Sequence, residues 1–139
     1  MLSFLIPSDV VQSLAEQKQI KNNKIETEKQ TILFQDDVYQ DLKEVYLQNQ
    51  LTEISLCLKG KIINNTYFIS SFYKPKTYFA TPISVSSNKC EDSIITMHTH
   101  PFNNCLLSQQ DVLSYYSYKD DKLITMVMCS VDKFALYGV

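Results

Sequence analysis

Both histidines of this 139-residue chain lie in one short segment, His98-x-His100, and Asp111 follows eleven residues after the second. On an extended segment, side chains at i and i+2 project from the same side of the backbone, so both imidazoles can face one ion. Asp111 can return on the first turn of a following helix. Two histidines and one aspartate leave a fourth tetrahedral position for water, as in catalytic zinc sites, whereas structural zinc usually has four protein ligands. The spacing therefore predicts one Zn²⁺ per chain, with a bound water.

The same residues carry a family resemblance. His98-x-His100-Pro101, six residues and then Ser108-x-x-Asp111 resemble the signature of the JAB1/MPN/Mov34 (JAMM) metallopeptidases. Members of this family remove ubiquitin or ubiquitin-like proteins by cutting isopeptide or peptide bonds. The resemblance implies a zinc-dependent peptidase or isopeptidase, deubiquitinase-like, of a minimal prokaryotic-type or viral-type form. Its substrate would be a ubiquitin-like protein, its conjugate or its C-terminal tail.

The family also has an upstream glutamate that opens a strand with the pattern Glu-x-x-Gly-x-Leu-x-Gly. Here Glu53, Leu58 and Gly60 match that pattern, while Leu56 replaces the inner glycine. The resemblance implies that Glu53 is the general base, which takes a proton from the zinc-activated water and passes it to the leaving amine. An exposed glutamate at the start of a strand is the alternative reading. Glu44 is a nearby competitor, but it lies on a predicted helix.

Two residues of the metal loop have open roles. The resemblance gives Ser108 a hydrogen bond that stabilises the tetrahedral intermediate or orients the water. Ser108-x-x-Asp111 is also typical of a helix N-terminus, where the serine caps and the acid favours the helix dipole, and both roles can hold together. Cys105 could supply a thiolate that closes the fourth zinc position, but inward packing of this residue is favoured.

Other functions remain open. The first alternative is a non-catalytic MPN-type scaffold or binding subunit of a larger complex. Leu56 at the glycine position and the absence of long insertions favour it, and the retained metal-site residues argue against it. A partner subunit or a homodimer is left open for either function. A RadC-like relative ranks low, because its Gly-Asp-Pro-rich loop is absent. A zinc deaminase ranks lower, because its His-x-Glu and Pro-Cys-x-x-Cys motifs are absent.

Composition places the chain among ordinary globular domains. Apolar residues make up 45% and charged residues 20%, with a net charge of −2. Neither a nucleic-acid partner nor a membrane is expected from this charge, and no apolar run is long enough for a membrane span. All 13 basic residues are lysines. Base and phosphate recognition favours arginine, which also argues against sequence-specific nucleic-acid binding.

The four cysteines form no C-x-x-C pair, and the amino terminus has no basic signal-peptide region. Cys57 and Cys129 lie within apolar strand patterns, which predicts buried reduced thiols. A reducing, cytoplasmic location is therefore expected.

The remaining pattern predicts the elements that must position the site. Residues 1–30 are expected to form a short helix after Ser8 and then a polar stretch, either a frayed helix extension or a connector. Residues 31–139 form the main domain. Strands are predicted at 31–34, 54–58, 67–73, 94–97, 123–129 and 134–137, with helices after Asp36-Asp37 and over 108–118. This order predicts an α/β or α+β fold. The resemblance implies the cytidine-deaminase-like JAMM architecture, a mixed β-sheet flanked by helices.

Overall fold

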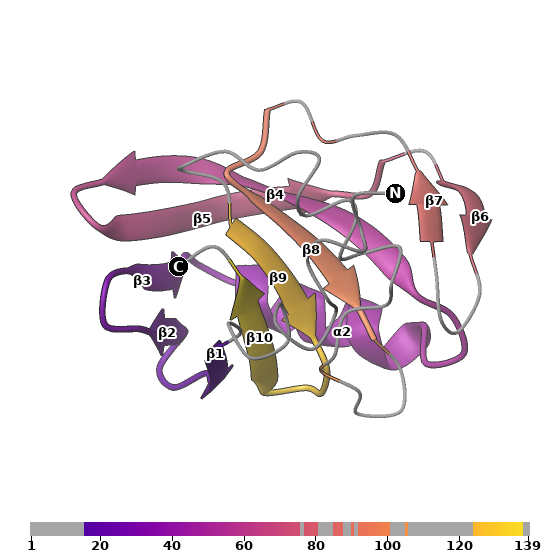
Figure 1. Ribbon diagram of the computed structural model, residues 1–139, viewed down its shortest axis with the longest axis horizontal. Helices are drawn as coiled ribbons and strands as arrows, with labels where there is room; N and C mark the ends of the chain where they lie inside the picture. The colour runs from indigo at the N-terminus through magenta and orange to yellow at the C-terminus, as the bar shows by residue number, and fades with distance from the viewer. Residues whose placement is uncertain are drawn as a thin grey trace, which may run out of the picture.

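The computed structural model describes residues 16–75, 77–80, 85–87, 90, 92–100, 105 and 124–137 (Figure 1). This part of the chain is mostly β-strand, with one helix. The elements are β1 (Glu16–Gln19), β2 (Lys24–Glu26), β3 (Thr31–Phe34), α2 (Val38–Gln48), β4 (Ile54–Ile63), β5 (Thr66–Tyr73), β6 (Thr77–Ala80), β7 (Val85–Ser87), β8 (Ile95–Thr99), β9 (Ile124–Met128) and β10 (Lys133–Tyr137).

Eight strands form one mixed sheet in the order β1-β10-β9-β8-β4-β5-β3-β2, while β6 and β7 form a separate pair. The β3–β5 and β8–β9 pairs are parallel, and the other pairs in the eight-stranded sheet are antiparallel. The edge strands β1 and β2 contact each other, so the sheet is nearly closed. The expected α/β architecture of JAMM type, with a sheet flanked by helices, is therefore wrong.

The polar stretch at residues 16–30 accounts for part of that error. It supplies β1 and β2, which pair with β10 and β3, instead of a helix extension or a connector. An edge strand needs few apolar side chains, because backbone hydrogen bonds supply its pairing. In this stretch only Ile20 and Ile25 are apolar, and both are buried in the core. Their wide spacing gave no alternating strand pattern.

Several other predictions are confirmed. The strand at 31–34, the helix after Asp36-Asp37 and the strands around the site form where the pattern placed them. Asn64 has a φ of 55° and turns the chain from β4 into β5. The helices expected after Ser8 and over 108–118 lie outside the described residues. No helix among the described residues combines the length and the apolar character needed to cross a membrane.

The hydrophobic core lies between α2 and one face of the sheet. Val38, Leu42 and Tyr46 form the buried side of α2, at the i, i+4 and i+8 spacing of a helix face. Leu56 and Met97, from adjacent strands, belong to the same buried cluster. Figure 1 shows α2 passing behind β8, β9 and β10. The opposite side chains of these strands therefore face away from α2.

Candidate functional site

The pairing of β4 with β8 builds the candidate site. Ile54 lies opposite Thr99, and Ser55 lies opposite His98 in this antiparallel pair. The same register, continued by one residue, places Glu53 opposite His100. Because alternate side chains share a face, Glu53 and both histidines project from the same side of the two strands.

The side chains of these three residues do converge. Glu53 Oε2 lies 3.5 Å from His100 Nε2, and Glu53 Oε1 lies 4.0 Å from His98 Nδ1. The Glu53 side chain is only 1% exposed, compared with 4% for His100 and 20% for His98. Glu53 is therefore not the exposed strand-start glutamate of the alternative reading. It is a buried carboxylate beside two imidazoles.

The residues next to Glu53 fix its position. The backbone N–H of Ile54 donates a hydrogen bond to Thr99 Oγ1 at 3.0 Å, which holds the start of β4 against the end of β8. Ser55 is buried on the same face as Glu53, directly across from His98. The local sequence pattern gives no sign of Ser55 as a site residue, because only the strand register brings it to the site.

The far end of β8 is held by its parallel neighbour. Parallel strands bring their carboxyl ends to one edge of a sheet, so His100 lies beside the end of β9. The backbone N–H of His100 donates to the carbonyl of Met128 at 3.0 Å. Tyr46 reaches the same edge from α2, and its hydroxyl lies 3.0 Å from the carbonyl oxygen of Cys129. Tyr46 is also on the buried side of α2, and local sequence pattern gives no sign of this polar contact.

The cysteines correct another prediction. Cys57 is bonded to Cys90 and Cys105 to Cys129, so the expectation of reduced thiols at Cys57 and Cys129 is wrong. The paired Cα atoms lie 5.6 Å and 4.9 Å apart, within the range that a disulfide spans. Sequence spacing cannot reveal such proximity. The cytoplasmic location was inferred from reduced cysteines, and that premise no longer holds.

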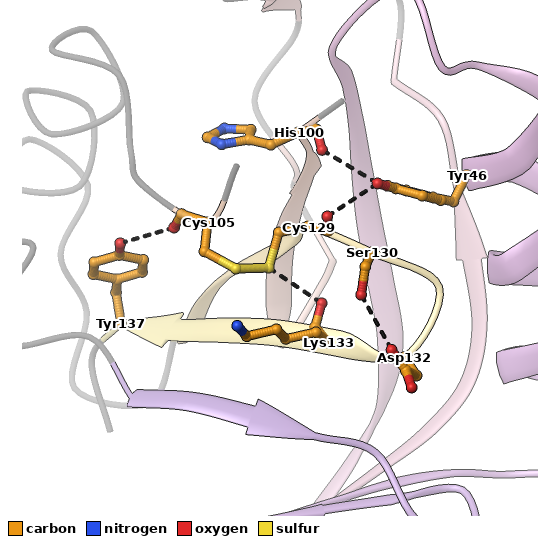
Figure 2. The surroundings of a disulfide bond; sticks show 8 residues. All are labelled: Tyr46, His100, Cys105, Cys129, Ser130, Asp132, Lys133 and Tyr137. Atoms are coloured by element: carbon orange, nitrogen blue, oxygen red, sulfur yellow. Dashed lines mark hydrogen bonds between the residues drawn. A yellow bond between two sulfur atoms is a disulfide. The ribbon is translucent and has the colours of Figure 1, made fainter. Parts of the chain in front are cut away.

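Figure 2 shows the second disulfide, which joins Cys105 to Cys129, the residue directly after β9. Cys105 is buried and its sulfur is bonded to Cys129, so it does not carry the free thiolate considered as a fourth zinc ligand. The Tyr137 hydroxyl donates to the carbonyl of Cys105 at 3.4 Å. The inward packing predicted for Cys105 is confirmed, with a covalent bond that packing alone did not predict.

The other predicted site residues, Ser108 and Asp111, lie outside the described residues. Within the described ranges no three histidine, cysteine or acidic side chains are arranged as a metal site. The described residues nevertheless suit the expected zinc chemistry in part. His98 and His100 supply two nitrogen donors, and Glu53 is a carboxylate near both rings, as the chemistry expected of a base requires.

Burial raises the pKa of the Tyr46 hydroxyl. This hydroxyl therefore stays protonated, and able to donate a hydrogen bond, at and well above neutral pH. Taken together, the arrangement can orient two imidazoles, accept or release a proton at Glu53, and hold the backbone after His100 in place.

No protein-family model matches this chain, and no curated protein matches its sequence.

Proposed function

We propose that this protein is a zinc-dependent peptidase or isopeptidase that removes ubiquitin or a ubiquitin-like modifier from conjugates, or processes the modifier's C-terminal tail. The observation that carries the proposal is the position of Glu53. A carboxylate that is 1% exposed lies within 4.0 Å of one imidazole and 3.5 Å of another. Burying an ionisable group is unfavourable, so such a placement is typical of a site that uses its charge or its proton.

His98, His100 and Asp111 are the residues that would hold the ion. When bound, zinc acts as a Lewis acid that polarises a carbonyl group and lowers the pKa of water to about 7. His98 lies in β8 and His100 directly follows its last residue, so the two rings are expected on one face, where both could serve the same ion.

Glu53 would move the proton. It directly precedes β4, where its carboxylate would accept the proton of the attacking water and later donate it to the leaving amine. The hydrogen bond from the Ile54 N–H to Thr99 would help to keep this carboxylate opposite the histidines. Ser108 would donate a hydrogen bond to the oxygen that becomes negatively charged, as an oxyanion-hole donor does.

The test combines zinc content with cleavage of a modifier–lysine conjugate. Glu53→Gln keeps the shape of the side chain but removes its basicity. We expect this variant to retain zinc and to lose about 10²- to 10⁴-fold in cleavage rate, the usual contribution of general acid–base catalysis. Glu44→Gln is the matched control, because Glu44 is an exposed glutamate on α2. It should cleave at the wild-type rate.

Two results would contradict the proposal. A zinc-loaded wild type that cleaves no conjugate or linear fusion in a broad panel would exclude the peptidase function. A folded wild type that takes up no zinc, and is found only in a stable complex, would instead support the scaffold function.

A further inference from the structure

We propose that Tyr46 is a positioning residue of the histidine site. Its hydroxyl holds the backbone after His100 against the end of β9 and so fixes where His100 places its ring. The consequence for zinc rests on the proposed function, whereas the effect on the His100 ring does not.

The contact is made by a buried hydroxyl. Tyr46 is 4% exposed, and its hydroxyl lies 3.0 Å from the Cys129 carbonyl oxygen and 3.5 Å from that of His100. The shorter contact is the stronger hydrogen bond, and the longer one is a weaker, shared donation. Figure 2 shows the hydroxyl between these two carbonyl groups. One side chain from α2 therefore links the ends of two strands that are distant in sequence.

Two hydrogen bonds hold the backbone of His100, one on each side of its Cα atom. The N–H of His100 is bonded to Met128, and its carbonyl group faces the Tyr46 hydroxyl. With both neighbouring peptide groups held, the direction of the side chain is set mainly by its rotamer. The His100 ring then meets Glu53 at 3.5 Å.

The disulfide extends the effect to the following segment. Cys129, which accepts the stronger hydrogen bond from Tyr46, is joined covalently to Cys105. Tyr46 thus contacts His100, and it also contacts Cys129, which is bonded to Cys105 five residues after His100. The expected ligand Asp111 lies further along the chain, outside the described residues.

The test removes only the hydroxyl. In Tyr46→Phe the aromatic ring still fills the core, but the donor to the two carbonyl groups is lost. Tyr39→Phe is the matched control, because Tyr39 is on the same helix and its hydroxyl donates to the backbone carbonyl of Val131 at 2.6 Å. That bond does not involve His100 or Cys129, so a general effect of losing a helix–sheet hydrogen bond appears in both variants.

The readout is the imidazole NMR spectrum of metal-free protein, which contains only two histidine rings. We expect Tyr46→Phe to shift the His100 ring resonances more than those of His98, and Tyr39→Phe to leave both in place. Zinc affinity, measured by chelator competition, should fall about 10-fold in Tyr46→Phe, the lower end of the range for residues that orient metal ligands. Unchanged His100 resonances in folded Tyr46→Phe would overturn the proposal.

The two proposals can fail separately. If wild type binds no zinc but Tyr46→Phe moves the His100 resonances, the zinc function fails and the positioning role stands. If wild type binds zinc and cleaves conjugates while Tyr46→Phe matches it in both zinc affinity and spectrum, only the positioning role fails. Should Tyr46→Phe not fold, 3-fluorotyrosine at position 46 keeps the ring and the hydroxyl and strengthens the donor. At neutral pH it should again move the His100 resonances, and unchanged resonances would overturn the proposal.

Discussion

Gly60 shows how one residue position shapes β4, the strand that directly follows Glu53. β4 is irregular between Lys59 and Gly60, where its pairing with β5 shifts register. A Cβ atom at Gly60 would overlap the backbone carbonyl oxygen of Phe68. The glycine that matched the family pattern therefore has a local physical reason, which is the close approach of two backbones at a bulge.

The first prediction follows from that overlap. We expect Gly60→Ala to lower the free energy of unfolding by about 3 kcal/mol, because the β4–β5 backbones must separate to admit a methyl group. Urea denaturation followed by circular dichroism measures it. Lys59→Ala is the control and should change stability little, since its ion pair with Asp92 is exposed and 3.6 Å long. Equal stability of Gly60→Ala and wild type would show that the strands can shift at no cost.

Residue types and spacing predicted only part of the site. The i, i+2 rule placed His98 and His100 on one face, and the resemblance singled out Glu53, which the strand register then brought to the same face. Tyr46 and Ser55 were not found, because their places depend on which strands are neighbours. Ser108 and Asp111 stay predictions. The local sequence pattern does not show which strands pair with each other, and this pairing brings the remaining residues to the site.

At the scale of elements, the disulfides join segments that hydrogen bonds alone hold less firmly. Cys57–Cys90 ties β4 to the segment before β8, with a sequence separation of 33, and Cys105–Cys129 spans 24 residues. Each bond restricts the unfolded chain. For loops of these lengths the chain-entropy model gives about 3–4 kcal/mol of stabilisation.

The second prediction compares the two bonds. Replacing Cys105 and Cys129 together by serine should lower the free energy of unfolding by about 3–4 kcal/mol and also shift the His100 imidazole resonances. The paired serine variant of Cys57 and Cys90 should lose similar stability without moving those resonances. Denaturant titration and NMR measure the two effects. If the two pairs of variants have the same His100 spectrum, the Cys105–Cys129 bond stabilises the fold without influencing the site.

Elements with a dense apolar pattern were predicted well, and sparse ones were not. α2 and β3 carry buried residues at regular intervals, so their period was readable. β1 and β2 are short and polar, and they are strands only because β10 and β3 offer them free edges. Local propensity does not show which neighbouring strands are available for pairing. It therefore predicts a helix extension or a connector for residues 16–30.

At the scale of the whole molecule, the amino-terminal strands complete the sheet. β1 adds to β10 at one edge, β2 adds to β3 at the other, and the two strands then contact each other. Gln19 Nε2 also donates to Asp132 at 2.8 Å, which joins β1 to the turn between β9 and β10. This hydrogen bond is the main reason that the pKa of Asp132 is lowered.

The third prediction concerns a chain that begins at residue 31. It loses β1, β2 and the buried side chains of Ile20 and Ile25, each worth about 1.5–3 kcal/mol of burial. That sum is comparable with the total stability of a typical domain, so we expect loss of cooperative thermal unfolding. A chain that begins at residue 16 keeps both strands and is the comparison. Cooperative unfolding of the shorter chain at the wild-type temperature would mean that residues 16–30 are peripheral after all.

The residues with left-handed backbone conformation also bear on how the stability of the protein could be raised. Asn22, Asn23 and Asn64 adopt φ values of 53°, 60° and 55°, and the whole chain contains only two glycines. Asparagine tolerates this conformation better than other side chains, but glycine adopts it without steric cost. Replacing these asparagines with glycine is therefore a way to raise the stability of the protein without changing the histidine site.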